Sequence, residues 1–260
     1  MTRCVCTVEY DGTGFCGWQR QDHAPSVQAS VEQALSKVAD HPVKIVCAGR
    51  TDTGVHATWQ VIHFDSEVSR SNRSWVLGTN SNLPDSVGLL SAQPVDAEFH
   101  ARFSAQSRRY RYVILNRSVS SALLRHRVSW QHRPLDVGLM QQGADLLVGE
   151  HDFSSFRAVA CQARNPVRTV QRLEVRRSGD FLYLDIQANA FLHHMVRNIA
   201  GVLMTVGCGK RPVEWVSEIL ALRDRTRGGV TAPASGLYLV GVSYPEAFGV
   251  APAGLVPVYG

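Results

Sequence analysis

The pattern of apolar and polar residues in the first hundred positions switches between the strand period of two and the helix period of about 3.6. Residues 3–10 alternate, so that cysteine, valine and tyrosine side chains share one face, as in a half-buried strand. Apolar residues after Ser26 recur at helical spacing, and the Ser26 hydroxyl can cap that helix. The other predicted elements are strands at 43–47 and 60–64, a helix at 72–80 and a strand at 87–95. Strands and helices thus alternate, which indicates an α+β unit.

A second run of elements follows residues 99–104, which we interpret as a crossing segment. Strands are predicted at 107–115, 168–177, 181–188 and 237–243, and helices at 136–148, 191–206 and 213–222. The order partly repeats that of the first run, although no repeat is visible in the sequence itself. We therefore predict an α+β protein with two similar α/β-plait halves of the ferredoxin-like type that share a central, mostly antiparallel sheet. The predicted parts are 1–103, 104–247 and a tail at 248–260.

The composition is that of an ordinary globular protein, with 45% hydrophobic and 19% charged residues in a chain of 260. No apolar run approaches the roughly 20 residues that span a bilayer, and the N-terminus leads into strand-like sequence without a signal-peptide core. The six cysteines are scattered, and none shows the C-x-x-C spacing of a zinc or redox site. We therefore expect a cytoplasmic protein with reduced thiols and no membrane contact.

Basic residues are concentrated in the second part of the chain. Residues 1–100 hold 7 Lys and Arg against 11 Asp and Glu, whereas residues 101–260 hold 20 against 11. Nearly all the basic residues are arginines, and they gather at 101–130 and 157–177. Arginine suits phosphate forks and base stacking, so nucleic acid is the expected partner, although a GC-rich genome would produce the same bias.

One acidic residue, Asp52, lies between Gly49 and Gly54 and two positions after Arg50. Glycine permits a close approach of substrate, and arginine can bind a phosphate or keep the carboxylate ionised, so the pattern fits a single activated aspartate. Taken alone, the segment 48–57 fits a tight turn with an exposed acid and base equally well. Its place on the connection between two predicted strands favours a loop residue that a rigid sheet presents to a cleft.

Two other functions that this loop suggests have little support. Gly49 and Gly54 are spaced as in a phosphate-binding loop, but Val55 and His56 stand where Lys and Ser or Thr are needed. Asp52 begins an Asp-Thr-Gly triplet like that of aspartic proteases, which need two carboxylates, and the sequence has no second triplet. A dimeric aspartic protease therefore stays as an alternative function, as does a non-catalytic RNA-binding protein.

Aromatic and arginine residues alternate along the predicted strand 107–115. Tyr110 and Tyr112 fall on one face, and Arg109 and Arg111 fall on the other. Such rings can stack on unpaired RNA bases while the arginines bind phosphates. A pair of tyrosines on a strand is also typical of a protein core, and the pattern leaves both interpretations open.

The predicted helix 191–206 has a broad apolar arc, and Arg197 lies almost opposite the middle of that arc, beside His193. Arg197 is therefore available to solvent or to a cleft. His193 and His194 are neighbours that cannot share one helix face, so we expect no metal pair there. Residues 228–239 are mostly small and lead into a strand, which fits an edge loop or a close backbone approach to a ligand.

Five motifs occur together along the chain, at 10–19, 48–57, 99–112, 191–198 and 231–239. In this combination the sequence strongly resembles the bacterial tRNA pseudouridine synthase A family over nearly its whole length, apart from the tail from about residue 248. The resemblance implies the pseudouridine synthase fold and the conversion of uridine to pseudouridine at positions 38, 39 and 40 of the tRNA anticodon stem-loop. It also implies a homodimer that uses no metal and no organic cofactor.

By the same resemblance, Asp52 is the catalytic aspartate, Tyr110 contacts the target base and Arg197 is the partner of the aspartate. The chemistry agrees, because uracil must leave C1′ of its ribose, turn, and rejoin through C5 without a redox step. An ionised Asp52 can attack C1′ or take the C2′ proton, and the sequence leaves both mechanisms open. Tyr110 can stack on the base and assist loss of the C5 proton, and Arg50 can hold the flipped base out of the stack.

Overall fold

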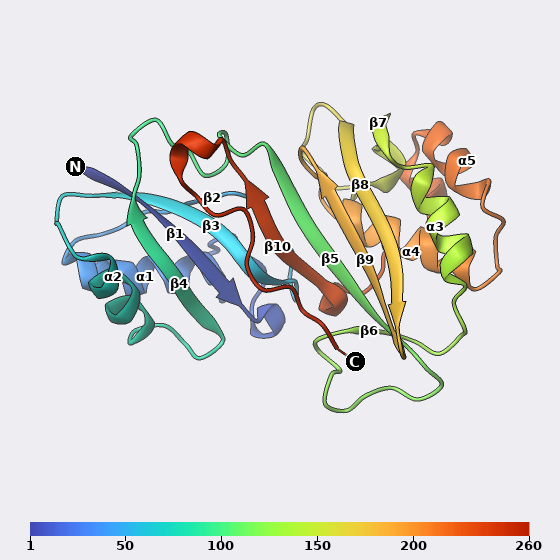
Figure 1. Ribbon diagram of the computed structural model, residues 1–260, viewed down its shortest axis with the longest axis horizontal. Helices are drawn as coiled ribbons and strands as arrows, with labels where there is room; N and C mark the ends of the chain where they lie inside the picture. Colours follow the sequence, from blue (N-terminus) through green and yellow to red (C-terminus); the bar gives the residue numbers. More distant parts are fainter. Residues whose placement is uncertain (260) are drawn as a thin grey trace. The chain divides into compact units, whose positions relative to one another are not determined.

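The structure, a computed structural model, describes residues 1–259 and divides the chain into two compact units (Figure 1). The first unit contains Met1–Gln106 together with Tyr238–Val256, and the second contains Ser107–Leu237 and the residues from Pro257 onward. In this division the last strand and most of the predicted tail belong to the first unit, and the boundary predicted at residue 103 lies at Gln106. Within the described residues, no helix has the length and apolar character needed to cross a membrane.

The first unit is a sheet of antiparallel strands with one parallel strand added. Its strands are β1 (Thr2–Tyr10), β2 (Val46–Cys47), β3 (His56–Ser66), β4 (Val87–Pro94) and β10 (Leu237–Ser243), and its helices are α1 (Val27–Ala39) and α2 (Asn72–Asn80). The strand order is β4-β1-β3-β10, in which β1 is antiparallel to both neighbours and β10 is parallel to β3. The short β2 pairs with β3 through Val46 and Cys47, which places the β2–β3 connection beside the start of β10.

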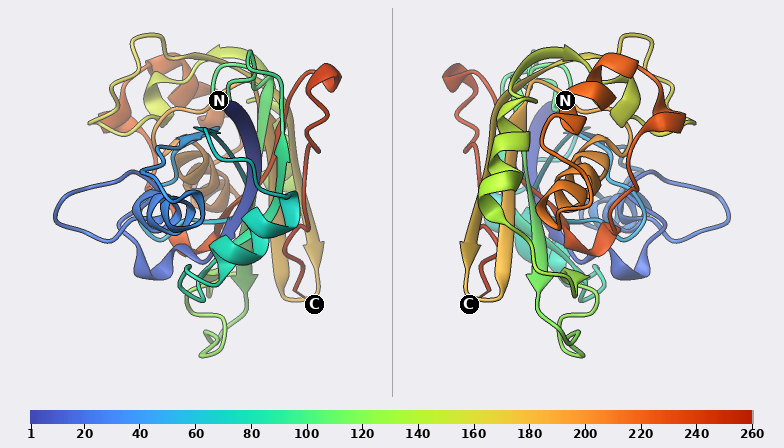
Figure 2. Two further views of the ribbon diagram at one scale, coloured as in Figure 1. Left: turned by 90° about the vertical axis from the view of Figure 1, so that its left-hand side faces the viewer. Right: turned by 90° about the vertical axis from the view of Figure 1, so that its right-hand side faces the viewer.

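Helix α1 forms as its sequence predicts. The Ser26 hydroxyl accepts a hydrogen bond from the Ala29 amide at 3.3 Å, which caps the first turn, and the left-handed Asp40 (φ 58°) ends the helix. Its apolar stripe is buried against the unit, with Val31 and Leu35 fully covered. In Figure 2, α1 lies on one side of the sheet and residues 249–256 run along the other.

The second unit is an antiparallel sheet with three helices. Its strands are β5 (Ser107–Asn116), β6 (Ser129–Gln131), β7 (Gly149–Asp152), β8 (Val167–Ser178) and β9 (Phe181–Ala188), and its helices are α3 (Val137–Asp145), α4 (Met195–Gly207) and α5 (Trp215–Leu222). The strand order is β5-β9-β8-β7, with every neighbouring pair antiparallel, and the short β6 is parallel to β5. The hairpin of β8 and β9 turns at Gly179, whose φ of 53° suits glycine.

The predicted α+β class is confirmed, since mostly antiparallel strands and five α-helices occur in the described residues. Most elements begin and end within two residues of their predicted limits. The short strands β6 and β7 were not predicted. Of the predicted strand 43–47, only Val46–Cys47 is a strand.

The prediction of a helix from residue 191 is wrong. Helix α4 begins at Met195 because His194 adopts a left-handed conformation (φ 64°), which a right-handed helix cannot contain.

A histidine inside β3 fixes the segment 99–104 to the sheet. The Nδ1 atom of His63 accepts a hydrogen bond from the Ala101 amide at 3.0 Å, and the ring packs edge-on against Phe99 and His100. Burial, assisted by the positive charge of Arg3, lowers the pKa of His63 to about 4. His63 is therefore neutral near pH 7 and can act as the acceptor that this contact requires.

We expect the free energy of unfolding to decrease as the pH is lowered, because His63 resists protonation in the folded protein. The pKa of His63 is lower in the folded chain than its usual value of about 6.5, so the unfolded chain binds the proton first as the pH drops below that value. Between pH 7 and 4.5 this difference lowers the free energy of unfolding by about 2 kcal/mol. Urea denaturation at both pH values measures the loss, and His63→Gln, which cannot titrate, should lose less. An equal loss in both proteins would contradict the assignment.

Candidate functional site

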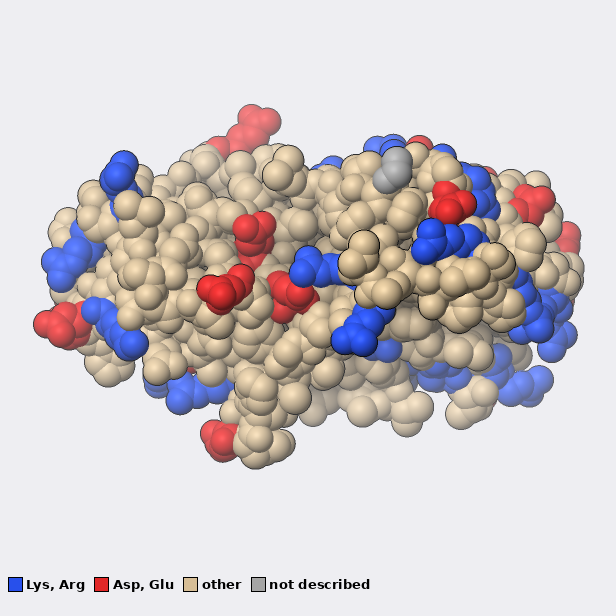
Figure 3. All heavy atoms as spheres, turned by 90° about the horizontal axis from the view of Figure 1, so that it is seen from below, with Lys and Arg blue, Asp and Glu red and all other residues tan. Residues whose placement is uncertain are grey.

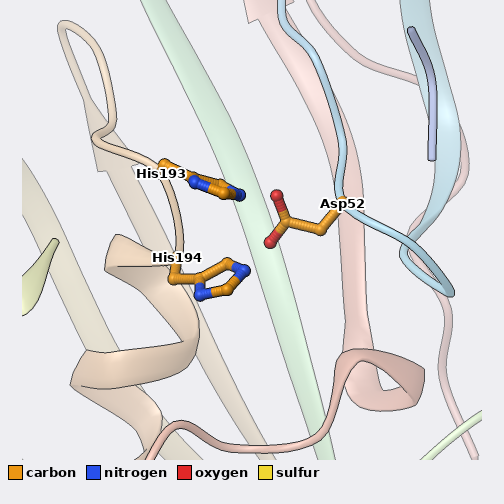
Figure 4. A group of neighbouring side chains, drawn as sticks. All are labelled: Asp52, His193 and His194. Carbon is orange, nitrogen blue, oxygen red and sulfur yellow. The ribbon is translucent and has the colours of Figure 1, made fainter. Parts of the chain in front are cut away.

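Asp52 lies on the connection between β2 and β3, as the sequence predicts, and projects from that loop (Figure 4). The loop is tight: the Val55 amide donates a hydrogen bond to the Asp52 carbonyl at 3.1 Å. Gly54 has a φ of 75°, a left-handed conformation that other residues adopt at a cost, whereas Gly49 needs no positive φ. The Asp52 side chain is partly buried, between a buried Thr51 and an exposed residue 53.

The segment that follows β1 holds this loop in place. The Trp18 amide donates a hydrogen bond to the Thr51 carbonyl at 3.0 Å, and the hydroxyls of Tyr10 and Thr51 are 2.7 Å apart. Both Trp18 and Tyr10 are buried. Two of the sequence motifs therefore form one structural element around Asp52.

Two glycines let the two backbones come close enough for these bonds. A Cβ atom on Gly12 would lie 2.0 Å from the Val55 carbonyl oxygen, and one on Gly17 would lie 2.9 Å from the Thr51 carbonyl oxygen. Gly17 also has a φ of 91°. No side chain fits at Gly12 without moving the loop that carries Asp52, so the glycine is a packing requirement.

A third motif contacts the far end of the loop. His56, the first residue of β3, accepts a hydrogen bond from the Gly12 amide on Nδ1 at 3.1 Å. Its ring stacks on that of Tyr238 with centroids 4.7 Å apart, and Tyr238 pairs with His56 where β10 runs parallel to β3. Buried aromatic packing therefore supports the residues that follow Asp52 directly.

Arg50 is exposed on the same loop. The loop backbone beneath it is fixed, since the Gln60 side-chain amide donates a hydrogen bond to the Gly49 carbonyl at 2.6 Å. Burial raises the pKa of the Cys47 thiol to about 11, and the positive charges of Arg50 and Arg102 oppose that increase. Val46 of the same strand pairs with His63, which bonds to the Ala101 amide, so the segment 99–104 lies beside the strand that leads into the loop.

In the second unit, the tyrosine face of β5 is part of the core. Tyr110 is 8% exposed and packs edge-on against Phe191, with ring centroids 5.1 Å apart, and Tyr112 is fully buried and donates a hydrogen bond to the Pro233 carbonyl at 2.8 Å. Burial raises the pKa of the Tyr112 hydroxyl, so it acts as a neutral donor. Of the two interpretations that the sequence left open, the core applies to Tyr112, while Tyr110 lies at its margin beside Phe191.

Arg111, on the other face of β5, is buried and bonded within the protein, whereas its pattern suggested a contact with phosphate. The side chain is buried, and its guanidinium forms two hydrogen bonds of 2.7 Å with the carboxylate of Asp185 on β9. The same group donates to the Pro257 carbonyl at 3.0 Å and lies over the ring of Tyr183. This buried, doubly bonded ion pair links β5 to β9 and directs the guanidinium into the protein and away from solvent.

Arg197 lies on α4 under the segment that leads to β10. Its Nε donates a hydrogen bond to the Ala232 carbonyl at 2.9 Å, and the Ala232 amide donates to the Arg197 carbonyl at 3.1 Å. A Cβ atom on Gly201, one turn further, would lie 1.8 Å from the Val230 carbonyl oxygen. The small residues of this segment thus permit a close approach to α4, and the approach fixes the plane of the Arg197 guanidinium.

A polar network next to Arg197 holds the same segment. The Thr231 hydroxyl donates to the Asn198 side-chain oxygen at 2.6 Å, and Arg225 donates to both of them at 2.8 Å and 3.1 Å. Asn198 is 1% exposed and donates its own amide to the Phe156 carbonyl at 2.6 Å. The sequence motifs included Asn198 and Thr231, but nothing in the sequence pointed to Arg225 as the group that links them.

The two histidines before α4 lie differently from the prediction. Because His193 and His194 precede the helix, the argument from helix faces does not apply, and their rings lie together with centroids 4.1 Å apart (Figure 4). Asp52 and Arg50 belong to the first unit, and Tyr110 and Arg197 belong to the second.

Comparisons with known proteins agree with these motifs. A family model described as tRNA pseudouridine synthase matches residues 6–104 and 144–245. A protein called tRNA pseudouridine synthase A from Methylococcus capsulatus is 59% identical over 249 residues, which cover 96% of this chain and 92% of the relative. Proteins of the same name from Pseudomonas aeruginosa and Alcanivorax borkumensis are 55% and 54% identical and cover 95% and 100% of this chain, and 87% and 97% of their own.

Among solved structures, a Cbf5-Nop10-Gar1 complex aligns with 91% of this chain and 48% of its own chain, at a TM-score of only 0.38 and 11% identity. The family model and the sequence relatives place the chain in the class of enzymes that isomerise uridine in RNA. The chain belongs to the tRNA pseudouridine synthase family.

Substitution of Gly12 should move the Asp52 loop. We expect Gly12→Ala to lower the free energy of unfolding by about 1–3 kcal/mol, because the new methyl group collides with the Val55 carbonyl. The rate of pseudouridine formation should fall at least about tenfold, since a displacement of the order of an ångström at a reacting group has a larger effect than this. The matched control is Gly14→Ala in the same turn, where a Cβ atom meets nothing within 4 Å. Equal behaviour of the two variants would show that the close approach at Gly12 does not position the loop.

Proposed function

We propose that this protein converts uridine to pseudouridine at positions 38, 39 and 40 of the tRNA anticodon stem-loop. Membership of the family and relatives of that name at up to 59% identity support this proposal. The observation that supports it most directly is the rigid placement of one carboxylate, Asp52, by Gly12, Gly17 and Trp18. An isomerisation that breaks and remakes one bond at a ribose carbon needs such a fixed group.

In the reaction that we propose, the bond between N1 of uracil and C1′ breaks and a bond between C5 and C1′ forms. The proton on C5 is lost, and N1 gains one, so that product and substrate are isomers. Asp52 is the catalytic residue, which either attacks C1′ or takes the C2′ proton. The carboxylate acts as an anion in both mechanisms.

Three further residues have proposed roles around the target nucleotide. Tyr110 lies against the base, and its ring is oriented by the edge-on contact with Phe191. Arg197 pairs with the carboxylate of Asp52, and its hydrogen bond to the Ala232 carbonyl orients the guanidinium fork for a carboxylate. Arg50, exposed on the loop, holds the flipped base out of the helical stack.

The charge of the second unit supports an RNA substrate. That unit holds 19 Lys and Arg against 10 Asp and Glu, whereas the first holds 8 against 12. Lysine and arginine side chains stand out on the molecular surface in Figure 3. Such an excess of arginine favours binding to phosphates.

Three further expectations stay predictions. The homodimer and the activity without metal or cofactor come from the family resemblance, and the cytoplasmic location comes from the sequence.

The two alternative functions predict different behaviour in solution. A non-catalytic RNA-binding protein would bind tRNA and leave every nucleotide chemically unchanged. A dimeric aspartic protease would cleave peptides at acid pH, with Asp52 in a pair that shares a proton. The relatives bear the name of an RNA isomerase, which favours the proposed function over both.

We expect Asp52→Asn to abolish pseudouridine formation while tRNA binding is kept. An amide of the same shape can neither attack C1′ nor take a proton, so the rate should fall at least about 1,000-fold, and the Kd for tRNA should change less than about threefold. The assay counts pseudouridine in an unmodified tRNA transcript without added cofactor. Asp85→Asn, at an exposed acid of the same unit, is the control. Product formed by Asp52→Asn at the wild-type rate would refute the catalytic assignment.

Arg197→Lys should lower turnover more than RNA affinity. Lysine keeps the positive charge but lacks both the planar fork and the Nε–H that bonds to Ala232, so we expect kcat to fall about 10- to 100-fold and Kd to rise less than about threefold. Single-turnover kinetics and a binding titration separate the two effects. Arg211→Lys, at an exposed position beyond α4, should match the wild type. Equal losses of turnover and affinity would make Arg197 a phosphate contact.

A further inference from the structure

Phe103 is an exposed aromatic ring on a turn that is otherwise firmly fixed. Its side chain is 75% exposed, whereas Phe99 and Ala101 in the same turn are fully buried. The Tyr244 hydroxyl donates a hydrogen bond to the Ala101 carbonyl at 2.6 Å, and the Ala101 amide donates to His63. A rigid, hydrogen-bonded turn therefore holds the Phe103 ring in an exposed position.

One face of the Phe103 ring is covered by a histidine of the same turn. The rings of Phe103 and His100 stack with centroids 4.3 Å apart and an angle of 29° between their planes. His100 accepts hydrogen bonds on Nδ1 from the amides of Arg102 and Phe103, at 3.2 Å and 3.1 Å. Burial and the charge of Arg3 lower the pKa of His100, so the neutral ring needed for these bonds is favoured. The stack is thus built from main-chain hydrogen bonds as well as ring contact.

One positively charged side chain lies against this stack, in a unit whose net charge is negative. The Arg102 guanidinium lies 5.4 Å from the centre of the Phe103 ring, within the range of a cation–π contact. The turn that carries the ring is bonded through Ala101 to His63 of β3, and His63 pairs with Val46 of β2. The exposed ring therefore belongs to a turn that is fixed beside β2, the strand that leads into the loop with Asp52.

We propose that Phe103, stacked on His100, is a platform for an unpaired base of the substrate RNA other than the target uridine, with Arg102 at an adjoining phosphate. This inference rests on the proposed function and adds a binding site to it. An exposed aromatic ring beside an arginine has the composition of single-strand RNA sites, in which bases stack on rings and guanidinium groups. The target uridine itself needs an enclosed pocket, which an open ring does not provide.

Stacking on an open ring recognises the face of a base and not its hydrogen-bonding edge. Every base has such a face, so the contact tolerates different nucleotides. An enzyme that modifies three neighbouring positions in many tRNAs meets different bases beside its target. The Phe103 platform would give affinity beside the reacting nucleotide without restricting which tRNA is used.

The test uses the full-length protein and a fluorescent anticodon stem-loop RNA. We expect Phe103→Ala to raise Kd about 5- to 100-fold, in line with the loss of one stacked base, and Phe103→Tyr to stay within about threefold of the wild type. Leu77→Ala removes a side chain that is 54% exposed on α2 of the same unit and should leave Kd unchanged. Thermal unfolding of each variant checks that the fold is intact. A 5-iodouridine placed in turn at each unpaired position should cross-link to Phe103 at a non-target position.

Three results would overturn the inference. The first is an unchanged Kd in Phe103→Ala, and the second is an equal loss in Phe103→Tyr, which would make the ring a structural element. The third is a change in oligomeric state of Phe103→Ala, measured by light scattering, that accounts for the whole loss of affinity and makes the ring a protein contact. The binding series does not depend on turnover, so a wild-type protein that binds the RNA but forms no pseudouridine would refute the proposed function separately.

Discussion

The candidate site depends on the close contact between two stretches of backbone, residues 12–18 and 51–55. No side chain fits between them at Gly12, where the Val55 carbonyl occupies the place of a Cβ atom, and the contact is completed by the hydrogen bond from Trp18 to Thr51. Main-chain atoms have few alternative positions once such contacts form, in contrast to a surface side chain. Asp52 is therefore carried by a part of the molecule that has almost no freedom to adjust.

Arg197 is held in a comparable way in the second unit. There too a glycine, Gly201, admits the carbonyl of another segment, and hydrogen bonds between main chain and side chain complete the contact. The polar network of Asn198, Thr231 and Arg225 is buried and connected, so each member has a partner within it. The glycines in the motifs of both units thus serve the packing of loops against helices and strands, and the charged side chains derive their orientation from that packing.

Much of the fold could be predicted because local signals agreed with tertiary packing. Alternation predicted β1 and β5, and the Ser26 cap predicted the start of α1. The start of α4 could not be predicted, because apolar spacing continued through residues 191–194 while the backbone turned left-handed at His194. The burial of Arg111 was missed for another reason, since its partner Asp185 lies 74 positions further along the chain and no local pattern joins them. Position and loop context made Asp52 the candidate catalytic residue, but no local pattern indicated that Gly12 fixes its loop, which only the distance between the two backbones reveals.

The return of the last strand to the first unit has a consequence for how the chain folds. The start of β3, directly after the Asp52 loop, pairs on one side with β1 and on the other with β10, whose residues are synthesised about 180 positions later. During synthesis the start of β3 therefore lacks β10 as its neighbour until residues 107–237 and β10 itself have left the ribosome. An unpaired strand edge is prone to wrong pairing with other chains, so the nascent protein is most vulnerable to aggregation during this interval. The loop that carries Asp52 reaches its final environment only after β10 has been synthesised and has paired with β3.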